Sequence, residues 1–159
     1  MTDIFARDKR SEIMSHIRSR GTRPEQLLFE LVRSMVPPNL ALVRNAKTEP
    51  GCPDVLIPSL RLAIFCHGCF FHSCPIHGHL PMSNQEYWRQ KLQRNVRRDR
   101  SNARKLRKRG YSVLTFWEHD LKVSQMTKTS KRLGRAIAQR LQSLYQTQEG
   151  FSSFPSSEV

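Results

Sequence analysis

The eleven residues from Cys69 to His79, CFFHSCPIHGH, combine two cysteines, three histidines and two adjacent phenylalanines. Thiolate sulfur and imidazole nitrogen are ligands that suit a tetrahedral zinc ion. Cys69, Cys74 and His77 have the donor types and the close spacing of a structural zinc half-site. Three donors do not close such a site, so a fourth ligand must come from elsewhere in the chain.

Three histidines compete for the fourth position. His119 follows the β-favouring run YSVLTFW, and the end of a strand can bring it beside the loop. His79 is the local alternative, and His72 lies between the two cysteines. The alternative to the whole site is a set of buried cysteines and solvated histidines without metal, because the spacing C-x4-C is less diagnostic than two C-x2-C pairs.

Two carboxylates and two histidines have side chains suited to phosphodiester chemistry. Asp54 opens a hydrophobic strand in GCPDVLI, where a carboxylate can hold Mg²⁺ beside a phosphate, although aspartate often begins strands for turn reasons alone. Glu25 is three residues after Thr22, which is also the spacing of a capping box. His67 and His72 flank the loop after the run RLAIFC, and histidine can transfer protons near neutral pH.

Phe70, Phe71 and Trp88 are candidates for contact with nucleic-acid bases. Adjacent aromatic side chains usually contribute at least one ring to a core, and Trp88 falls on the apolar stripe of a predicted helix. On a basic protein, aromatic rings can also insert between base pairs and unstack them. Both interpretations stay open from the sequence.

The charge of the chain indicates a polyanionic partner. Its 159 residues include 27 Lys and Arg against 13 Asp and Glu, which gives a formal net charge of +14. No apolar run approaches the roughly 20 residues of a membrane-spanning helix, and the opening residues lack the core of a signal peptide. Four cysteines in such a chain favour thiolates over disulfides. We therefore expect a cytoplasmic protein that acts on nucleic acid.

Hydrophobic periodicity predicts a framework for these residues. Helices are expected over 6–20, over 23–36, from Ser83 as N-cap to Gly110 as stop, and from about 129 onward. Strands are expected over 41–45, 53–58, 61–66 and 111–117. This pattern is typical of a single α/β domain, which we assign to residues 1–146, with a disordered tail at 147–159. Most of the polar surface of the third helix is cationic.

Five sequence blocks resemble the very-short-patch repair (Vsr) family of DNA mismatch endonucleases. They are RSEIMSHIRSRGTRPE, GCPDVLI, IFCHGCFFHSCPIHGH, YWRQKLQRNVRRD and GYSVLTFWEH, and they occur in the family's order. The resemblance implies a restriction-endonuclease-like core, a mixed sheet flanked by helices, with a structural zinc site. It also implies a magnesium-dependent nick in the thymine strand at T:G mismatches that arise when 5-methylcytosine deaminates, the step that initiates very-short-patch repair.

The resemblance further implies roles for individual residues. Asp54 matches the metal-binding aspartate, with the backbone carbonyl of Cys66 as a second contact to Mg²⁺, and Glu25 matches the helix-borne glutamate. His67 and His72 match two histidines near the cleaved phosphate, and His72 is the better candidate to activate the attacking water. The zinc pattern carries over as Cys69, Cys74, His77 and His119, and the intercalation set as Phe70, Phe71 and Trp88. Asn95 and Arg98 lie in the motif N-x2-RD without an assigned role.

Two other functions would explain part of these features. A noncatalytic zinc-containing DNA-binding module would account for the charge and the Cys/His cluster but leaves Asp54 unexplained. A restriction-type nuclease would use the same Mg²⁺ chemistry on matched duplex. The resemblance implies mismatch-repair proteins as further partners, and a location in the bacterial cytoplasm in association with the nucleoid. We expect a monomer, since no apolar stripe is left without a place in the core.

Overall fold

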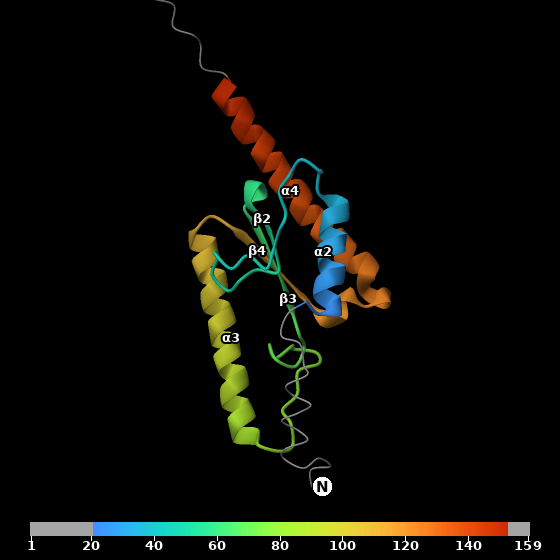
Figure 1. Ribbon diagram of the computed structural model, residues 1–159, viewed down its shortest axis with the longest axis vertical. Helices are drawn as coiled ribbons and strands as arrows, with labels where there is room; N and C mark the ends of the chain where they lie inside the picture. The colour runs from blue at the N-terminus through green and yellow to red at the C-terminus, as the bar shows by residue number, and fades with distance from the viewer. Residues whose placement is uncertain (1–20, 153–159) are drawn as a thin grey trace, which may run out of the picture.

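The computed structural model describes the backbone of residues 21–152 and the side chains of residues 21–146 (Figure 1). The basic helix expected over 6–20 lies outside the described residues. No helix in the described part of the chain is long and apolar enough to cross a bilayer.

Four strands form one mixed sheet in the order β1 (Val43–Arg44), β2 (Val55–Ile57), β3 (Leu62–His67) and β4 (Ser112–Trp117). The first three strands are antiparallel neighbours, whereas β3 and β4 are parallel. In this register His67 pairs with Trp117, so the segments that follow the two strands leave the sheet side by side. The mixed sheet expected from the sequence is confirmed.

In the described part of the chain, three helices cover the sheet: α2 (Arg23–Met35), α3 (Gln85–Lys108) and α4 (Met126–Ser152). Figure 1 shows α2 and α4 on one face and α3 on the other. The helix α3 belongs to the crossover that parallel strands such as β3 and β4 require. Short 3₁₀ turns cover Pro58–Leu60, Glu118–Leu121 and Val123–Gln125.

The two faces of the central strands bury different partners. On one face, Ile64 and Phe116 pack in a cluster with Leu28 and Val32 of α2 and Leu133 of α4. On the other face, a smaller cluster joins the last turn of α3 to the sheet; its buried members are Ala46, Leu56, Ala63, Leu106 and Tyr111. This division follows from the strand geometry, in which successive side chains point to opposite faces. The sheet is therefore a rigid support between the helices.

Helix boundaries differ from the expected ones at two points. The N-cap of α3 is Asn84 at a left-handed φ of 50°, so the predicted Ser83 cap is wrong. Asparagine tolerates this conformation, and Glu86 accepts a hydrogen bond from Gln90 Nε2 at 2.8 Å instead of closing a capping box. The helix α4 begins at Met126, earlier than the expected start near residue 129, and continues to Ser152, within the segment 147–159 that was expected to be a tail. Residues 153–159 lie outside the described part.

Candidate active site and metal cluster

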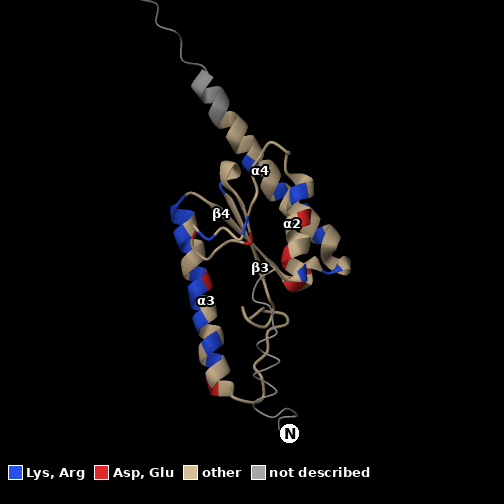
Figure 2. Ribbon diagram, viewed as in Figure 1, with Lys and Arg blue, Asp and Glu red and all other residues tan. Residues whose placement is uncertain are grey.

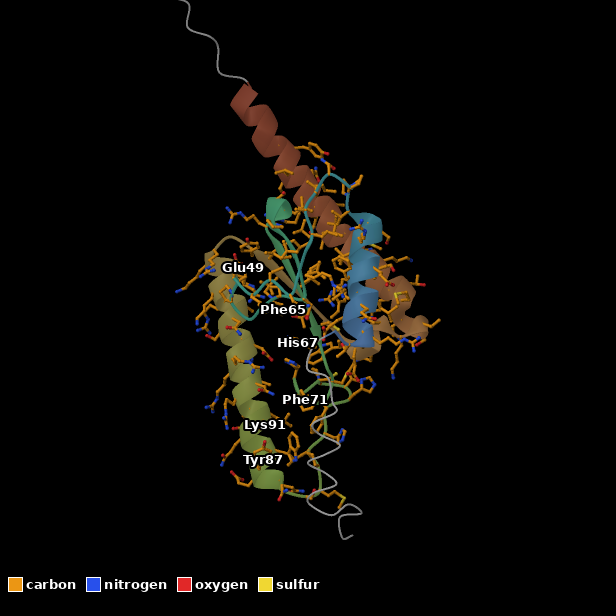
Figure 3. All side chains as sticks on the ribbon, in the orientation of Figure 1. Glu49, Phe65, His67, Phe71, Tyr87 and Lys91 are labelled. Carbon is orange, nitrogen blue, oxygen red and sulfur yellow. The ribbon has the colours of Figure 1, made fainter. Side chains whose placement is uncertain are left out.

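A cleft of about 1060 Å³ lies between the start of α2, the carboxyl end of β3 and the inner face of α3. Figure 3 shows Phe65, His67 and Phe71 in a row along α3, which contributes Tyr87 and Lys91. The candidate catalytic residues that line this cleft are Glu25, Asp54, Cys66, His67 and His72. The fold therefore gathers these residues from α2, the residue before β2, the end of β3 and the loop that follows β3.

Asp54 is a partly buried carboxylate directly before the inner strand β2. Its Oδ2 accepts a hydrogen bond of 2.7 Å from the backbone N–H of Cys66. Burial, with a smaller contribution from the nearby charge of Glu25, raises the pKa of Asp54 to about 6 against the opposing effect of the Cys66 N–H. Such a pKa means that the surroundings stabilise the negative charge of this carboxylate less well than water does. A bound cation would stabilise that charge. The donor chemistry thus fits a hard divalent ion.

Glu25 serves the helix end and the cleft together. Its Oε2 accepts the backbone N–H of Gly21 at 2.7 Å, and its Oε1 accepts the hydroxyl of Thr22 at 2.9 Å. These bonds fix the glutamate at the first turn of α2, as the capping-box spacing allows. The same side chain lines the cleft and adds negative charge near Asp54.

His67 and His72 stack with their ring centroids 4.0 Å apart and their planes inclined by 13°. His72 Nδ1 lies 2.6 Å from Asp99 Oδ2. A proton on Nδ1 satisfies this contact, so that Nε2 remains the nitrogen that can take up a proton. Burial, reinforced by the positive charge that His72 can carry, lowers the pKa of His67 to about 4. His67 is therefore neutral near neutral pH.

Asp99 is a site residue that the sequence reasoning missed. Burial alone would raise its pKa, but the hydrogen bond and positive charge of His72 outweigh burial and lower it. One turn earlier on α3, Asn95 donates from Nδ2 to the carbonyl oxygen of Phe71 at 2.9 Å. The spacing of these two residues in N-x2-RD, four apart on one helix face, was the available signal. Together they fix the loop after β3 against α3.

The three aromatic residues form one contiguous group beside the cleft. The ring centroid of Phe70 lies 5.0 Å from that of Trp88 and 5.1 Å from that of Phe71, in edge-on arrangements. Trp88 is buried, whereas both phenylalanines are partly buried. Phe71 and Trp88 line the cleft, and Phe70 packs behind them against His79. Phe71 is the ring of this set that combines partial exposure with a position in the cleft wall.

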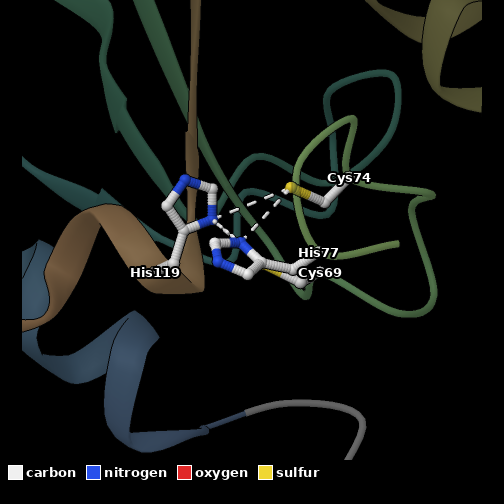
Figure 4. A group of neighbouring side chains, drawn as sticks. All are labelled: Cys69, Cys74, His77 and His119. Atoms are coloured by element: carbon white, nitrogen blue, oxygen red, sulfur yellow. Dashed lines mark hydrogen bonds between the residues drawn. The ribbon is translucent and has the colours of Figure 1, made fainter. Parts of the chain in front are cut away.

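The structure brings Cys69, Cys74, His77 and His119 together, with one donor atom of each within 4.8 Å of the others (Figure 4). Nδ1 of His119 lies 3.1 Å from Cys69 Sγ, 3.7 Å from Cys74 Sγ and 3.2 Å from His77 Nδ1. A tetrahedral zinc ion with Zn–N near 2.1 Å and Zn–S near 2.3 Å has ligand separations of about 3.3–3.8 Å. The spacing and the donor types therefore fit zinc.

The two competing histidines have other contacts. His72 is hydrogen-bonded to Asp99, and His79 Nδ1 lies 3.4 Å from the carbonyl oxygen of His77.

Both cysteines of the cluster are buried, and burial raises the pKa of Cys69 to about 11, which a bound cation would reverse. A second donor group, His67, His72 and Asp99, could also hold a cation, but the bond between His72 and Asp99 already occupies Nδ1.

The turn of the Cys/His loop is tight. The N–H of Gly78 donates to the carbonyl oxygen of Cys74 at 2.7 Å. A Cβ atom at position 78 would lie 2.5 Å from that oxygen, so the turn excludes larger residues unless the backbone shifts. Glycine thus allows His77 to turn back toward Cys74.

A basic helix beside a cleft that contains a desolvated carboxylate and a histidine–aspartate pair is an arrangement suited to phosphodiester cleavage, and comparisons identify the chain as a DNA endonuclease. Residues 2–77 match the family model described as DNA mismatch endonuclease Vsr. The type II nicking enzyme V.NmeAIP of Neisseria meningitidis is 36% identical over 86% of this chain and 95% of its own length. The DNA mismatch endonuclease Vsr of Escherichia coli is 32% identical over 89% of this chain and 86% of its own. The chain belongs to the Vsr family.

Proposed function

We propose that the protein is a Mg²⁺-dependent endonuclease that nicks the thymine strand at T:G mismatches left by deamination of 5-methylcytosine, and so initiates very-short-patch repair. The observation that carries this proposal is the meeting of Asp54, the pair of His72 and Asp99, and the aromatic ring of Phe71 in one cleft. Family membership supports it, because one relative is named a mismatch endonuclease and others are named nicking enzymes.

Asp54 and the backbone carbonyl of Cys66 are the residues that would hold Mg²⁺. When bound, this ion supplies Lewis acidity to the phosphate and favours a water in its deprotonated form. Glu25 adds negative charge without being free to move, since both of its oxygens are hydrogen-bonded to the start of α2. Strand β3 keeps Asp54 in position through the hydrogen bond from the Cys66 N–H.

His72 is the residue that would take the proton from the attacking water. Asp99 holds its Nδ1 and compensates the charge that the ring gains, which leaves Nε2 as the proton acceptor. His67, which its surroundings keep neutral, supports the ring of His72 by stacking and can donate a hydrogen bond to a phosphate oxygen.

The Cys/His cluster would hold zinc as a structural ion. Four protein donors complete a tetrahedral site and leave no position for water or substrate. The loop between Cys69 and Cys74 contains His72 and Phe71, so zinc would fix the catalytic histidine and the recognition ring together. We further propose a restriction-endonuclease-like core, a monomeric protein, and mismatch-repair proteins as partners in the bacterial cytoplasm.

Recognition of the mismatch would use Phe71, supported by Phe70 and Trp88. Unstacking an intact base step costs about a few kcal/mol, and a T:G pair, which stacks less well, lowers that cost. The rigid packing of Phe70 and Trp88 behind Phe71 means that little conformational entropy is lost when the ring inserts.

One experiment tests the proposal against both alternatives. A short duplex labelled on the thymine strand is incubated with and without a T:G pair, and with and without Mg²⁺. We expect one nick in the labelled strand that requires both the mismatch and Mg²⁺. Cleavage of both strands of matched duplex would instead identify a restriction-type nuclease, and binding without any nick would identify a noncatalytic module.

A further inference from the structure

The face of α3 that points away from the cleft forms a cationic strip. Its members follow one another at helical spacing and are all exposed: Arg89, Arg97, Arg100, Arg104, Arg107 and Lys108. Among the described residues none of these side chains has an acidic partner, and beyond the first turn the only acid of α3, Asp99, lies on the cleft face. Figure 2 shows basic residues along almost the full length of α3. The strip is thus an uncompensated row of charge.

The strip and the cleft lie on opposite sides of one helix. Trp88, Asn95 and Asn102 line the cleft, whereas Arg89, Arg97 and Arg100 line a separate groove of about 400 Å³. An α-helix with its side chains is about 10–12 Å across. The full width of α3 therefore separates the strip from the cleft, so the strip offers phosphate contacts distinct from those that line the cleft.

The dimensions and chemistry of the strip fit the backbone of duplex DNA. From Arg89 to Lys108 it extends about 29 Å at 1.5 Å per residue, which is close to one turn of B-DNA at about 34 Å. The groove beside it has an aliphatic floor of Leu80, Leu92 and Val96. Its lining contains no aromatic ring among the described residues, and single-strand binding relies on rings for base stacking. The strip is therefore suited to contacts with the phosphates of duplex DNA and not to recognition of its bases.

We propose that the outer strip of α3 is a second, sequence-independent DNA-binding surface, so that one molecule holds two duplex segments at once, one in the cleft and one on the strip. Such a protein can pass between neighbouring DNA segments without full release, because counterion-driven contacts form on the second segment before those on the first are lost. The inference rests on the proposed function only in requiring that the cleft binds the mismatched duplex.

The test uses the full chain with two differently labelled short duplexes, one with a T:G pair and one matched, in buffer without Mg²⁺. Sedimentation velocity measures the composition of the complex. We expect one protein molecule with one duplex of each kind. A complex of two proteins with two duplexes, or failure to bind a second duplex at all, would overturn the proposal, and the latter result would leave the strip for a partner such as an acidic protein surface.

Charge reversal then locates the second site. The triple variant Arg97→Glu, Arg100→Glu, Arg104→Glu should lower affinity for the second duplex by at least about tenfold and reduce the magnitude of its salt dependence by about three phosphate contacts. Nicking of the T:G duplex at saturating protein with Mg²⁺ should stay within about twofold of wild type. If nicking fails in parallel with capture, the strip and the cleft are one surface and the inference is wrong.

A matched control separates position from total charge. The variant Lys128→Glu, Lys131→Glu, Arg135→Glu makes the same charge change at exposed positions of α4. It should retain capture of the second duplex, and equal loss in both variants would overturn the assignment to α3. Replacement of the three α3 arginines by Gln, checked by thermal unfolding, provides the same test if charge reversal impairs folding.

Discussion

The Cys/His cluster and the cleft are both suited to metal ions, but they differ in completeness. The cluster offers two sulfurs and two imidazoles from buried or loop-bound residues, with their donor atoms already at ligand spacing. The cleft offers the Asp54 carboxylate, with an unfavourable burial cost, beside a wide open volume. Complete protein ligation is typical of structural sites, and partial ligation leaves positions for substrate and water. Loss of a ligand in the Cys/His cluster should therefore affect folding, and loss of Asp54 in the cleft should affect the rate of cleavage.

The largest expected effect is on chemistry. Asp54→Asn should reduce nicking by at least about 10²–10³-fold, because it removes the charged ligand from the cleft. Thermal unfolding without Mg²⁺ should occur at the same or a higher temperature, since an amide avoids the cost of burying a charge. Glu30→Gln on the exposed face of α2 is the matched control and should behave as wild type. Retention of strong Mg²⁺-dependent nicking by Asp54→Asn would refute the assigned centre.

The next effect is on stability. His119→Ala should lose bound zinc and lower the melting temperature by more than about 10 °C, because structural zinc binding is coupled to folding. Metal content by mass spectrometry and thermal unfolding measure the two effects on one preparation. His79→Ala removes the neighbouring histidine and should keep zinc near one equivalent. If His79→Ala loses zinc and His119→Ala keeps it, the fourth ligand is His79 and not His119.

A smaller effect should come from Asp99, which contacts the histidine that we propose as the general base. Asp99→Asn should lower the nicking rate by about 10²-fold while the zinc content stays unchanged. The loss should appear in the nicking rate at saturating protein and not in DNA affinity, because Asp99 acts through its contact with His72. Arg98→Gln alters an exposed neighbour 3.5 Å from the carboxylate and serves as the control. A lower melting temperature with a normal nicking rate of the folded protein would reduce Asp99 to a purely structural role.

The smallest effect concerns recognition. Phe71→Ala should reduce nicking of T:G duplex by about tenfold, as expected from the loss of about 1–3 kcal/mol of stacking. Zinc content and melting temperature should change little. A core role predicts instead a loss of about 3–5 kcal/mol in the free energy of unfolding with normal nicking by the folded fraction. Ile76→Ala, a side chain 73% exposed in the same loop, is the control for general loop damage.

Local patterns gave most of the secondary structure. The helix stop at Gly110, with φ of 82°, and the Thr22 cap of α2 follow from chemistry within a few residues, and both are found in the structure. The start of α3 at Asn84 could not be predicted with the same rules, because a left-handed asparagine depends on how the preceding loop enters the helix. The end of α4 similarly lies beyond the last apolar position that the pattern contains.

The candidate site was only partly predictable for a related reason. Asp54, His67 and His72 have side chains suited to phosphodiester chemistry, and the resemblance that gave them roles rests on short local blocks of sequence. Asp99 was missed because its role comes from a contact with His72, 27 residues earlier in the chain. The resemblance placed Asn95 and Arg98 in the motif N-x2-RD without a role, and the motif contained no information about which loop would pack on that helix face.

The sequence by itself determined the donor types, the excess of positive charge and the alternation that builds the sheet, since these depend on side-chain chemistry and short-range backbone preference. Only the tertiary structure decided which histidine joins the cysteines and which face of α3 lines the cleft. The physical reason is the parallel register of β3 and β4: His67 beside Trp117 brings Cys69 next to His119, 50 residues away. The crossover through α3 then directs Asp99 toward His72 and leaves the arginine strip on the opposite side.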